Sequence, residues 1–321
     1  MGAPSIPRAL AIGAVAFVAL VAAPLATGST VLIDFVIRLS ALAIFATSLN
    51  LLAGYGGMVS FGHGMFYGFG AYCFALMMQR TGVSIPVAFL TTVVGAALVS
   101  AIIGAICVRL KEVYFSFVTL AFQMLIHAII LAAMPLTGGD QGLRGGVPRP
   151  VFLGVDLSNQ MQLCVFSAFL LVASLLVMHH VVASPFGATL RMIRDNAQRA
   201  AYLGVAVDRV RLKAFVIAAV FAAVGGVVQA LFVSGAYPEF AYWTMSGEGI
   251  FVIMLGGLTT FLGPTLGSVI MLLLNDVVTR FTHYHGLVLG IVILVAALGL
   301  RKGLGDFVVE RLADRRRQEA A

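Results

Sequence analysis

The sequence predicts an all-α polytopic membrane protein with about 8–10 transmembrane helices, with glycine-rich broken or re-entrant segments, and with both termini cytoplasmic. Two observations predict this class. First, 61% of the 321 residues are hydrophobic and only 10% are charged, whereas soluble domains carry about 25% charged residues. Second, the hydrophobic residues form repeated runs of about 18 or more, the length at which a helix crosses a bilayer.

Ten apolar segments follow one another along the chain. They lie at residues 9–26, 31–53, 61–78, 85–108, 113–134, 162–182, 212–233, 249–262, 264–281 and 286–300. The pieces 249–262 and 286–300 are short for a complete span, so we expect them to be tilted or re-entrant. The first segment resembles a signal peptide, but in a chain with many later spans we expect an uncleaved helix.

The basic residues predict the orientation of the chain. Six of the 20 Lys and Arg residues fall within 191–213, and six more fall within 301–317. Short basic loops of membrane proteins lie on the cytoplasmic side, which places the loop 183–211 and the tail 301–321 in the cytoplasm. The connection 135–161 then faces the outside. We expect no nucleic-acid binding, because cytoplasmic loops explain these charges.

The stretch NLLAGYGGMVSFGHGMFYGFGAY (residues 50–72) interrupts the apolar pattern with glycines and polar residues. Glycine costs a helix about 1 kcal/mol relative to alanine, and a broken helix survives in lipid only against protein or a watery cavity. The stretch therefore predicts a discontinuous helix, and two interpretations remain open together: a solute path and close helix packing. GGMVSF (56–61) also resembles GGLTTF (256–261), and both are placed on the cytoplasmic side.

The cytoplasmic loop contains SPFGATLRMIRDNAQRAAYLGV (Ser184–Val205), which has the signals of one amphipathic helix. Its serine–proline start suits an N-cap and a first helical position, and Gly204 supplies a stop. Arg191, Asp195 and Arg199 are spaced by four, so they are expected to pair along one face. Two interpretations are open: a helix lying on anionic lipid, and a helix docked to a cytoplasmic partner.

Several motifs taken together resemble one transporter family. In chain order they are SLNLLAGYGGMVSFGHGMFYGFGAY, LTGGDQGLRG, the loop sequence given above, SGEGIFVIMLGGLTTFLGPTLGS and LGLRKGLGD. Beyond the first helix, the chain resembles the permeases of branched-chain amino acid ABC importers, and more narrowly their M-type subunit. The resemblance implies a single permease domain over residues 1–321 in a bacterial inner membrane. It makes the loop 183–211 the coupling element, with the tail 301–321 in the cytoplasm.

The resemblance also implies partners and an energy source. A paralogous permease subunit, two cytoplasmic ATPase subunits and a periplasmic solute-binding protein would complete the importer, and ATP and Mg²⁺ would bind in the ATPases. No cofactor is expected in this chain. None of its lysines (Lys111, Lys213 and Lys302) follows a glycine, so it has no P-loop and is not expected to be an enzyme. The expected substrate is a branched-chain amino acid, with other amino acids, urea, short amides and small aromatic acids as alternatives.

The competing class is an ion-coupled secondary transporter or channel. Such a protein relies on acidic residues within the membrane, and its candidates here are Asp34, Glu248 and Asp276, near segment ends. A membrane hydrolase has no support, since GxSxG, HExxH and SxxK motifs are absent from the sequence. The three cysteines lie in apolar runs without metal-ligand spacing, so no metal site is expected.

Three groups of site residues follow. The candidate substrate path consists of polar and aromatic residues in or near the broken segments: Asn50, Ser60, His63, Tyr67, Gln123, Glu248 and Thr260. The candidate ATPase-coupling residues all lie in the cytoplasmic loop: Phe186, Leu190, Arg191, Arg194, Asp195, Arg199, Ala200, Ala201 and Gly204. The candidate contacts to a binding protein lie in TGGDQGLRG: Asp140 and Arg144.

Overall fold

The computed structural model describes residues 6–110, 112–143, 145–149, 151, 156–281, 286–288, 290–291 and 294. All regular structure in these ranges is helical, as predicted. The long helices are α1 (Ile6–Thr27), α2 (Thr30–Asn50), α3 (Gly64–Thr81), α4 (Ile85–Cys107), α5 (Glu112–Ala132), α7 (Gln160–Ala183), α10 (Val207–Val233), α11 (Trp243–Gly256) and α12 (Gly263–Phe281). The short ones are η1 (Leu51–Tyr55), α6 (Met134–Thr137), η2 (Gly139–Gln141), α8 (Pro185–Asp195), α9 (Ala197–Tyr202) and η3 (Pro238–Ala241).

Within the described ranges, six helices are long and apolar enough to cross a membrane: α1, α2 with η1, α4, α5, α7 and α10. The predicted polytopic membrane class is therefore confirmed. Three of the ten expected segments, now α3, α11 and α12, are outside this set. α11 has only 14 residues, or about 21 Å at ~1.5 Å per residue, too short for a ~30 Å core. Most of the segment 286–300, and all of the tail 301–321, lie outside the described residues.

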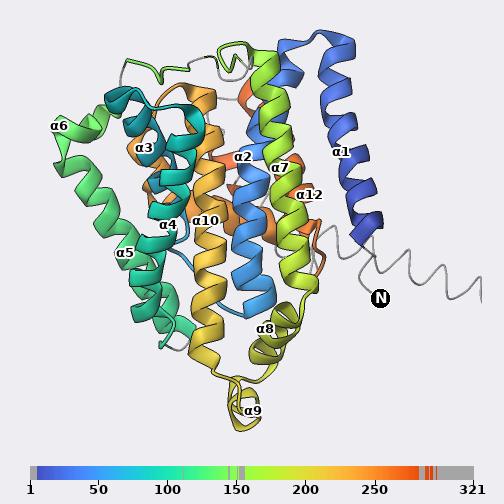
Figure 1. The fold of residues 1–321 in the computed structure, drawn as a ribbon, viewed down its shortest axis with the longest axis vertical. Coiled ribbons are helices and arrows are strands. Elements are labelled where there is room, and N and C mark those ends of the chain that lie inside the picture. The colour runs from blue at the N-terminus through green and yellow to red at the C-terminus, as the bar shows by residue number, and fades with distance from the viewer. Residues whose placement is uncertain are drawn as a thin grey trace, which may run out of the picture.

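The bundle is built around α2 and α10 (Figure 1). α10 contacts α2, α3 and α4, while α2 also contacts α7 and α12. α1 stands at one edge against α7, and α5 stands at the opposite edge. The side chains of Leu10, Val15 and Leu25 on α1 are exposed. An exposed apolar surface of this kind suits contact with lipid.

Small residues allow the central helices to approach closely. Lipid tails are as apolar as leucine, so membrane helices associate through van der Waals packing and hydrogen bonds rather than through the hydrophobic effect. At Gly226 of α10, a methyl group would lie 2.0 Å from the carbonyl oxygen of Tyr67 on α3. α10 buries a set of such residues along its length: Ala214, Ala218, Ala219, Ala222, Ala223, Gly225, Gly226 and Ala230.

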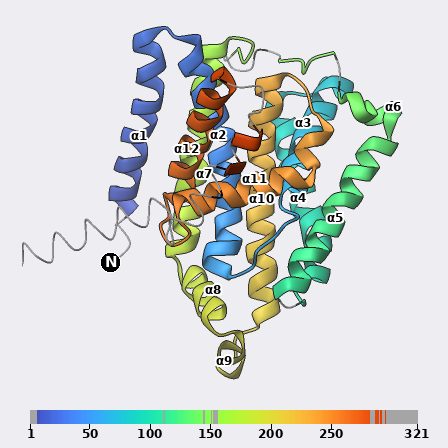
Figure 2. The same ribbon diagram turned by 180° about the vertical axis from the view of Figure 1, so that it is seen from behind.

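α11 and α12 form a hairpin against this bundle. Figure 2 shows α11 lying across the bundle in front of α10, and α12 running along α2. The prediction of a tilted or re-entrant piece near 249–262 agrees with this arrangement. The hairpin turns at residues 257–262, where Gly257 has a φ of 105°.

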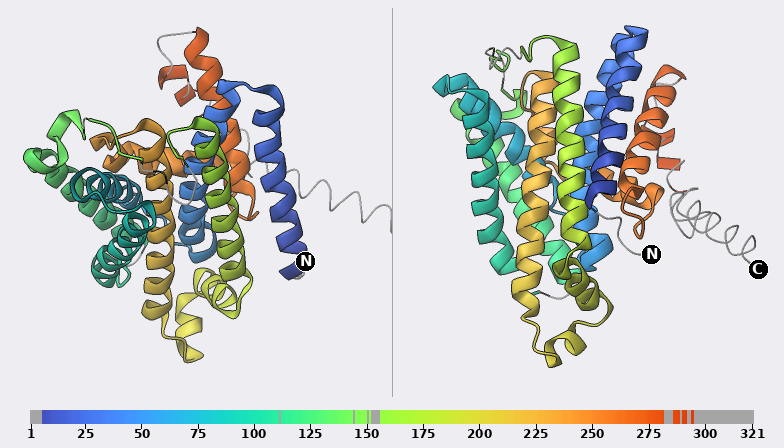
Figure 3. Two further views of the ribbon diagram at one scale, coloured as in Figure 1. Left: turned by 45° about the horizontal axis from the view of Figure 1, so that its top comes forward. Right: turned by 45° about the vertical axis from the view of Figure 1, so that its right-hand side comes forward.

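The two ends of the bundle differ in character. α8 and α9 project from one end, here called the α8 end (Figure 3), and the described residues of the connection 138–159 lie at the opposite end. Gln79 donates a hydrogen bond to the Gly146 carbonyl oxygen (2.7 Å), and Arg149 donates one to the Leu231 carbonyl oxygen. These bonds fasten the connection to α3 and α10. α1 begins toward the α8 end (Figure 1); which end faces the cytoplasm stays a prediction from the charges.

We predict that Gly226→Ala destabilises the bundle by about 1–3 kcal/mol, because the added methyl group would overpack the contact between α10 and α3. The measurement is the melting temperature of the detergent-purified protein. Gly247→Ala on α11 is the matched control, since a methyl group there meets no atom within 4 Å. Equal melting temperatures for the two variants would contradict the packing argument.

Candidate functional site

The glycine-rich stretch is a break between two helices, as the sequence predicts. α2 ends at Asn50 and continues as the π-helical turn η1. Residues 57–60 have no helical hydrogen-bond pattern, and α3 begins at Gly64. Gly57 has a φ of 66°, a left-handed conformation that glycine adopts without the steric cost of a Cβ atom. The break leaves backbone carbonyl groups that require donors from elsewhere.

α8 supplies such a donor. The Arg194 Nη1 atom donates a hydrogen bond of 2.6 Å to the Gly54 carbonyl oxygen within η1. A methyl group at Gly57 would lie 2.8 Å from Arg194 Cγ, so glycine makes room for this arginine. The guanidinium of Arg191 lies 5.9 Å from the ring centre of Tyr55, which adds a cation–π contact. The loop helix is thus attached to the break itself.

The loop 183–211 forms two helices, α8 and α9, so the prediction of one continuous helix is wrong. The chain extends at Asn196 (φ −160°, ψ 101°), whose side chain accepts a hydrogen bond of 2.9 Å from the Arg199 backbone N–H. Asparagine favours this capping position over a helix interior. The expected Arg191–Asp195 and Asp195–Arg199 pairs are absent among the described residues. Asp195 instead pairs with Arg194 at 3.2 Å.

The apolar face of α8 is directed into the chain's own bundle. Leu190 and Ile193 are buried, and a Cβ at Gly56 would lie 3.4 Å from Leu190 Cδ1. The exposed apolar side chains lie instead at the end of α9, where Tyr202 is 92% and Leu203 69% exposed. These two residues were not among the predicted contacts to a partner.

The remaining predicted coupling residues lie partly at this tip and partly against the bundle. Ala200 is buried, while Arg199 and Ala201 are exposed. Gly204 has a φ of 85° just after the last turn of α9, as a helix stop requires. Phe186 is half-buried against the core. The structure therefore divides the predicted set into residues that attach α8 to the bundle and residues that remain accessible.

Gly54, two residues before the first of the two similar hexapeptides, lies against the second hexapeptide. A methyl group at Gly54 would lie 2.6 Å from the Leu258 carbonyl oxygen in the α11–α12 turn and 2.3 Å from the Asn50 side-chain oxygen. Asn50 is buried, and neither of its amide atoms has a hydrogen-bond partner among the described residues. Thr260 lies in the same α11–α12 turn. The amide of Asn50 therefore lies beside the junction of the two breaks.

His63 is enclosed beside the break. Its ring stacks on Phe45 at 5.4 Å, and its Nε2 atom lies 2.9 Å from Ser48 Oγ. The Ser48 hydroxyl also donates to the Phe45 carbonyl oxygen at 2.7 Å, and the tautomer in which Nε2 donates to Ser48 Oγ satisfies both contacts. Nδ1 of His63 and the buried Ser60 hydroxyl have no partner among the described residues. The role of both residues in the substrate path stays a prediction.

Gln123 belongs to a chain of hydrogen bonds that fixes the start of α3. The Gly64 N–H donates to Ser246 Oγ, and Ser246 Oγ donates to Gln123 Oε1, both at 2.7 Å. Gln123 Nε2 then donates to the Tyr242 carbonyl oxygen, also at 2.7 Å. Both polar atoms of the Gln123 amide are thus used in joining α5 to α11. Its role in the substrate path stays a prediction.

A cavity of about 330 Å³ lies between α2, α10, η3, α11 and α12. It contains two of the predicted path residues, Tyr67 and Glu248, together with Arg38. Its volume falls within the ~300–1,000 Å³ usual for small-molecule sites. The other residues that line it are Leu42, Gln229, Phe232, Glu239, Phe240, Thr244, Met245, Leu272 and Asn275.

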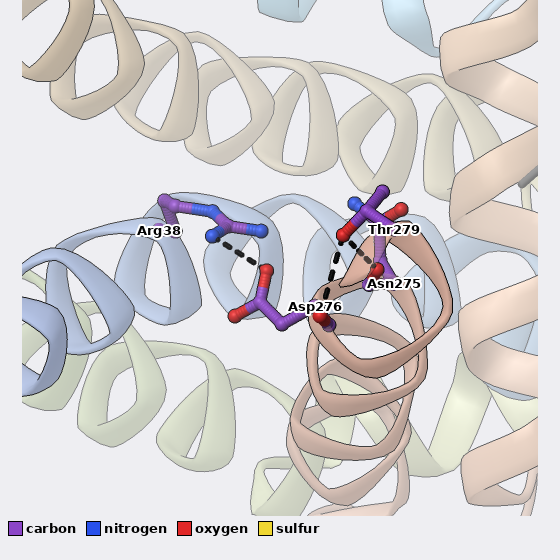
Figure 4. Close-up of polar contacts among 4 residues, drawn as sticks. All are labelled: Arg38, Asn275, Asp276 and Thr279. Carbon is purple, nitrogen blue, oxygen red and sulfur yellow. Dashed lines mark hydrogen bonds and ion pairs between the residues drawn. The ribbon is translucent and has the colours of Figure 1, made fainter. Parts of the chain in front are cut away.

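Arg38 carries the positive charge of this cavity. Its Nη1 atom lies 2.9 Å from Asp276 Oδ1, so the pair joins α2 to α12 (Figure 4). The two side chains are 27% and 31% exposed. Arg38 was not among the predicted site residues, although a lone arginine inside the apolar run 31–53 is a signal of functional importance.

The predicted contacts to a binding protein lie at the end opposite α8. Asp140 is exposed in η2, within the connection 138–159. Arg144 lies outside the described residues. Among the described residues, no group of three His, Cys, Asp or Glu side chains could hold a metal ion.

A membrane bundle with a broken central helix, a polar cavity and an external helix attached to the break defines a transport domain. Residues 31–297 match the family described as branched-chain amino acid transport system, permease component, and the chain belongs to this family. It is thus a permease of the ABC importer class and a multi-pass protein of the bacterial inner membrane.

Three relatives illustrate the similarity. The chain is 26% identical over 288 residues to the high-affinity branched-chain amino acid transport system permease protein LivM of Salmonella typhimurium, covering 81% of this chain and 67% of the relative. It is 25% identical to LivM of Escherichia coli over the same length and coverage, 288 residues, 81% and 67%. It is 27% identical over 232 residues to the autoinducer 2 import system permease protein LsrC of Salmonella paratyphi B, covering 68% and 63%. No solved structure matches the chain.

We predict that Ser246→Ala lowers stability by about 1–3 kcal/mol, because it leaves the buried Gly64 N–H and Gln123 Oε1 without their partner. Thermal unfolding of the purified protein measures the effect. Ser167→Ala is the matched control, because Ser167 Oγ is buried and has no partner among the described residues. A loss no larger than in this control would show that the network does not hold α3 in place.

Proposed function

We propose that the chain is the M-type permease subunit of an ATP-driven importer and forms the translocation path for branched-chain or related amino acids. A paralogous permease subunit, two cytoplasmic ATPase subunits and a periplasmic solute-binding protein complete the assembly. ATP and Mg²⁺ bind in the ATPases, and this chain hydrolyses no nucleotide. Family membership supports the transport class, and the structural observation that carries the proposal is the attachment of α8 to the break in α2.

The attachment explains how a partner would act on the path. The exposed tip of α9, with Tyr202 and Leu203, offers an ATPase an apolar docking surface. Displacement of α8 would act on η1 through the bond between Arg194 and Gly54. η1 continues directly into α2, whose Arg38 lines the cavity. Movement at the α8 end is thereby transmitted to the cavity along one helix.

The charges in the cavity favour an amino acid as the solute. Arg38 and Glu248 line the same cavity as Leu42, Phe232 and Leu272. A zwitterion with an apolar side chain offers a partner to each of these two polar groups and contacts the apolar wall, whereas a neutral solute leaves Glu248 without a cationic partner. Two of the relatives carry names as branched-chain amino acid permeases and one as an autoinducer 2 permease. The first solute class suits this cavity better.

The decisive experiment begins with affinity purification of the tagged chain in mild detergent and mass spectrometry of its partners. We expect two P-loop ATPases and a second permease, and we expect ATP-dependent uptake of L-leucine in proteoliposomes that contain the assembly and its binding protein. Uptake by this chain alone, driven by an ion gradient, would favour a secondary transporter. In that case Asp34, Glu248 and Asp276 would be the residues to substitute.

We predict that Arg194→Ala in the assembled importer lowers uptake about tenfold while ATP hydrolysis and co-purification of the ATPases persist. The reason is that Arg194 connects α8 to Gly54 within the chain, although the sequence assigned it to the ATPase contact. Arg199→Ala is the control, since its exposed side chain makes no described contact to the break. It is expected to affect co-purification instead. Normal uptake by Arg194→Ala would rule out this route of transmission.

A further inference from the structure

We propose that Arg38 binds the carboxylate of an apolar α-amino acid by exchanging its ion pair with Asp276, while Glu248 binds the ammonium group. The inference rests on the proposed function, and it assigns the solute site to particular residues. It also implies that solute binding breaks the ion pair that links α2 to α12.

The position of Arg38 suits solute entry from the end opposite α8. α2 runs from that end toward α8, and Arg38 lies eight residues after its first residue, Thr30, or ~12 Å along the helix. Asp276 lies five residues before the last residue of α12, Phe281. Glu239 of η3 lines the same cavity and is exposed. The charged groups therefore line the part of the bundle nearest the expected binding-protein side.

The charges in the cavity are not balanced. Arg38 is paired with Asp276, whereas Glu248 and Glu239 have no hydrogen bond or ion pair within the described part of the chain. Glu248 and Glu239 therefore lack a cationic partner among the described residues. The ammonium of an amino acid is a group that can pair with Glu248.

The carboxylate of the same solute has one partner available. Among the described residues that line the cavity, Arg38 is the only arginine or lysine. A guanidinium can donate two parallel hydrogen bonds to one carboxylate, but Arg38 donates to Asp276 through a single nitrogen, Nη1. The pair is also partly exposed, at 27% and 31%, so an incoming carboxylate can reach it. When the solute carboxylate replaces the Asp276 carboxylate, Arg38 still has an anionic partner.

Exchange has a mechanical consequence. The bond between Arg38 and Asp276 is a polar link between α2 and α12, two helices that pack against one another (Figure 4). Once the solute occupies Arg38, α12 loses this link, and Asp276 is free to turn toward water. Solute binding would therefore loosen the α11–α12 hairpin from α2. The effect requires no contact with the ATPases.

Direct binding can be measured on the full-length chain in detergent. Trp243 is the single tryptophan and immediately precedes Thr244 and Met245, which line the cavity, so its fluorescence reports on occupancy. We expect L-leucine to change the emission. Leucinamide, which lacks the carboxylate, and 4-methylpentanoate, which lacks the ammonium group, are expected to bind at least tenfold more weakly. If L-leucine leaves the Trp243 emission unchanged, or if the three compounds bind with equal affinity, the proposal is overturned.

Substitutions identify the residues in the same assay. Arg38→Gln is expected to weaken L-leucine binding at least tenfold, and Asp276→Asn is expected to strengthen it several-fold by removing the competing carboxylate. Arg209→Gln is the matched control, because this exposed arginine at the start of α10 is remote from the cavity. Unchanged affinity in Arg38→Gln overturns the assignment.

Swapping the charges of Arg38 and Asp276 by substitution, in the assembled importer, distinguishes a solute-binding role of the ion pair from a purely structural role. The double variant Arg38→Asp/Asp276→Arg can re-form the ion pair, so we expect it to recover the thermal stability lost in Arg38→Asp while uptake stays below about a tenth of wild type. Recovery of uptake would show that the pair serves structure alone. Failure of the proposed function can be distinguished from failure of this inference, because the wild-type assembly would then show no ATP-dependent uptake of L-leucine.

Discussion

The need to satisfy backbone carbonyl groups where α2 breaks is the constraint on which the rest of the structure depends. In a membrane, an unpaired carbonyl group costs several kcal/mol, so a broken helix requires a donor from another part of the protein. Arg194 provides it for Gly54 from a helix 140 positions away in the sequence. The glycine at position 57 admits the arginine side chain, so the break and the loop helix require one another.

α2 links the two functional regions of the protein. Its η1 extension holds Gly54 beside α8, and its other half carries Arg38 in the cavity. These residues are 16 positions apart, or ~24 Å along a helix at ~1.5 Å per residue. A rigid helix transmits displacement over this distance without intermediate steps, because its hydrogen bonds resist bending. The flanking contacts with α10, through small residues, leave little room for α2 to move sideways.

Much of the architecture could be predicted, and most of the site pairings could not. Hydropathy predicted the membrane class, and the glycines of residues 50–72 predicted the break. The split of the loop at Asn196 was missed, because its capping bond to the Arg199 N–H competes with a continuous helix that the spacing equally allowed. Arg38 and Asp276 are separated by 238 positions, so their pairing depends on how α12 packs against α2.

The sequence alone determined that the chain crosses a membrane repeatedly, where its helices must break, and which family it resembles, because these properties depend on local composition and on ordered motifs. Only the tertiary structure decided the contacts of the charged residues. Arg194 binds within the chain rather than remaining free for a partner, and Glu248 shares a cavity with Arg38. The physical reason is that electrostatic partners are chosen by distance in space, and helix packing sets that distance.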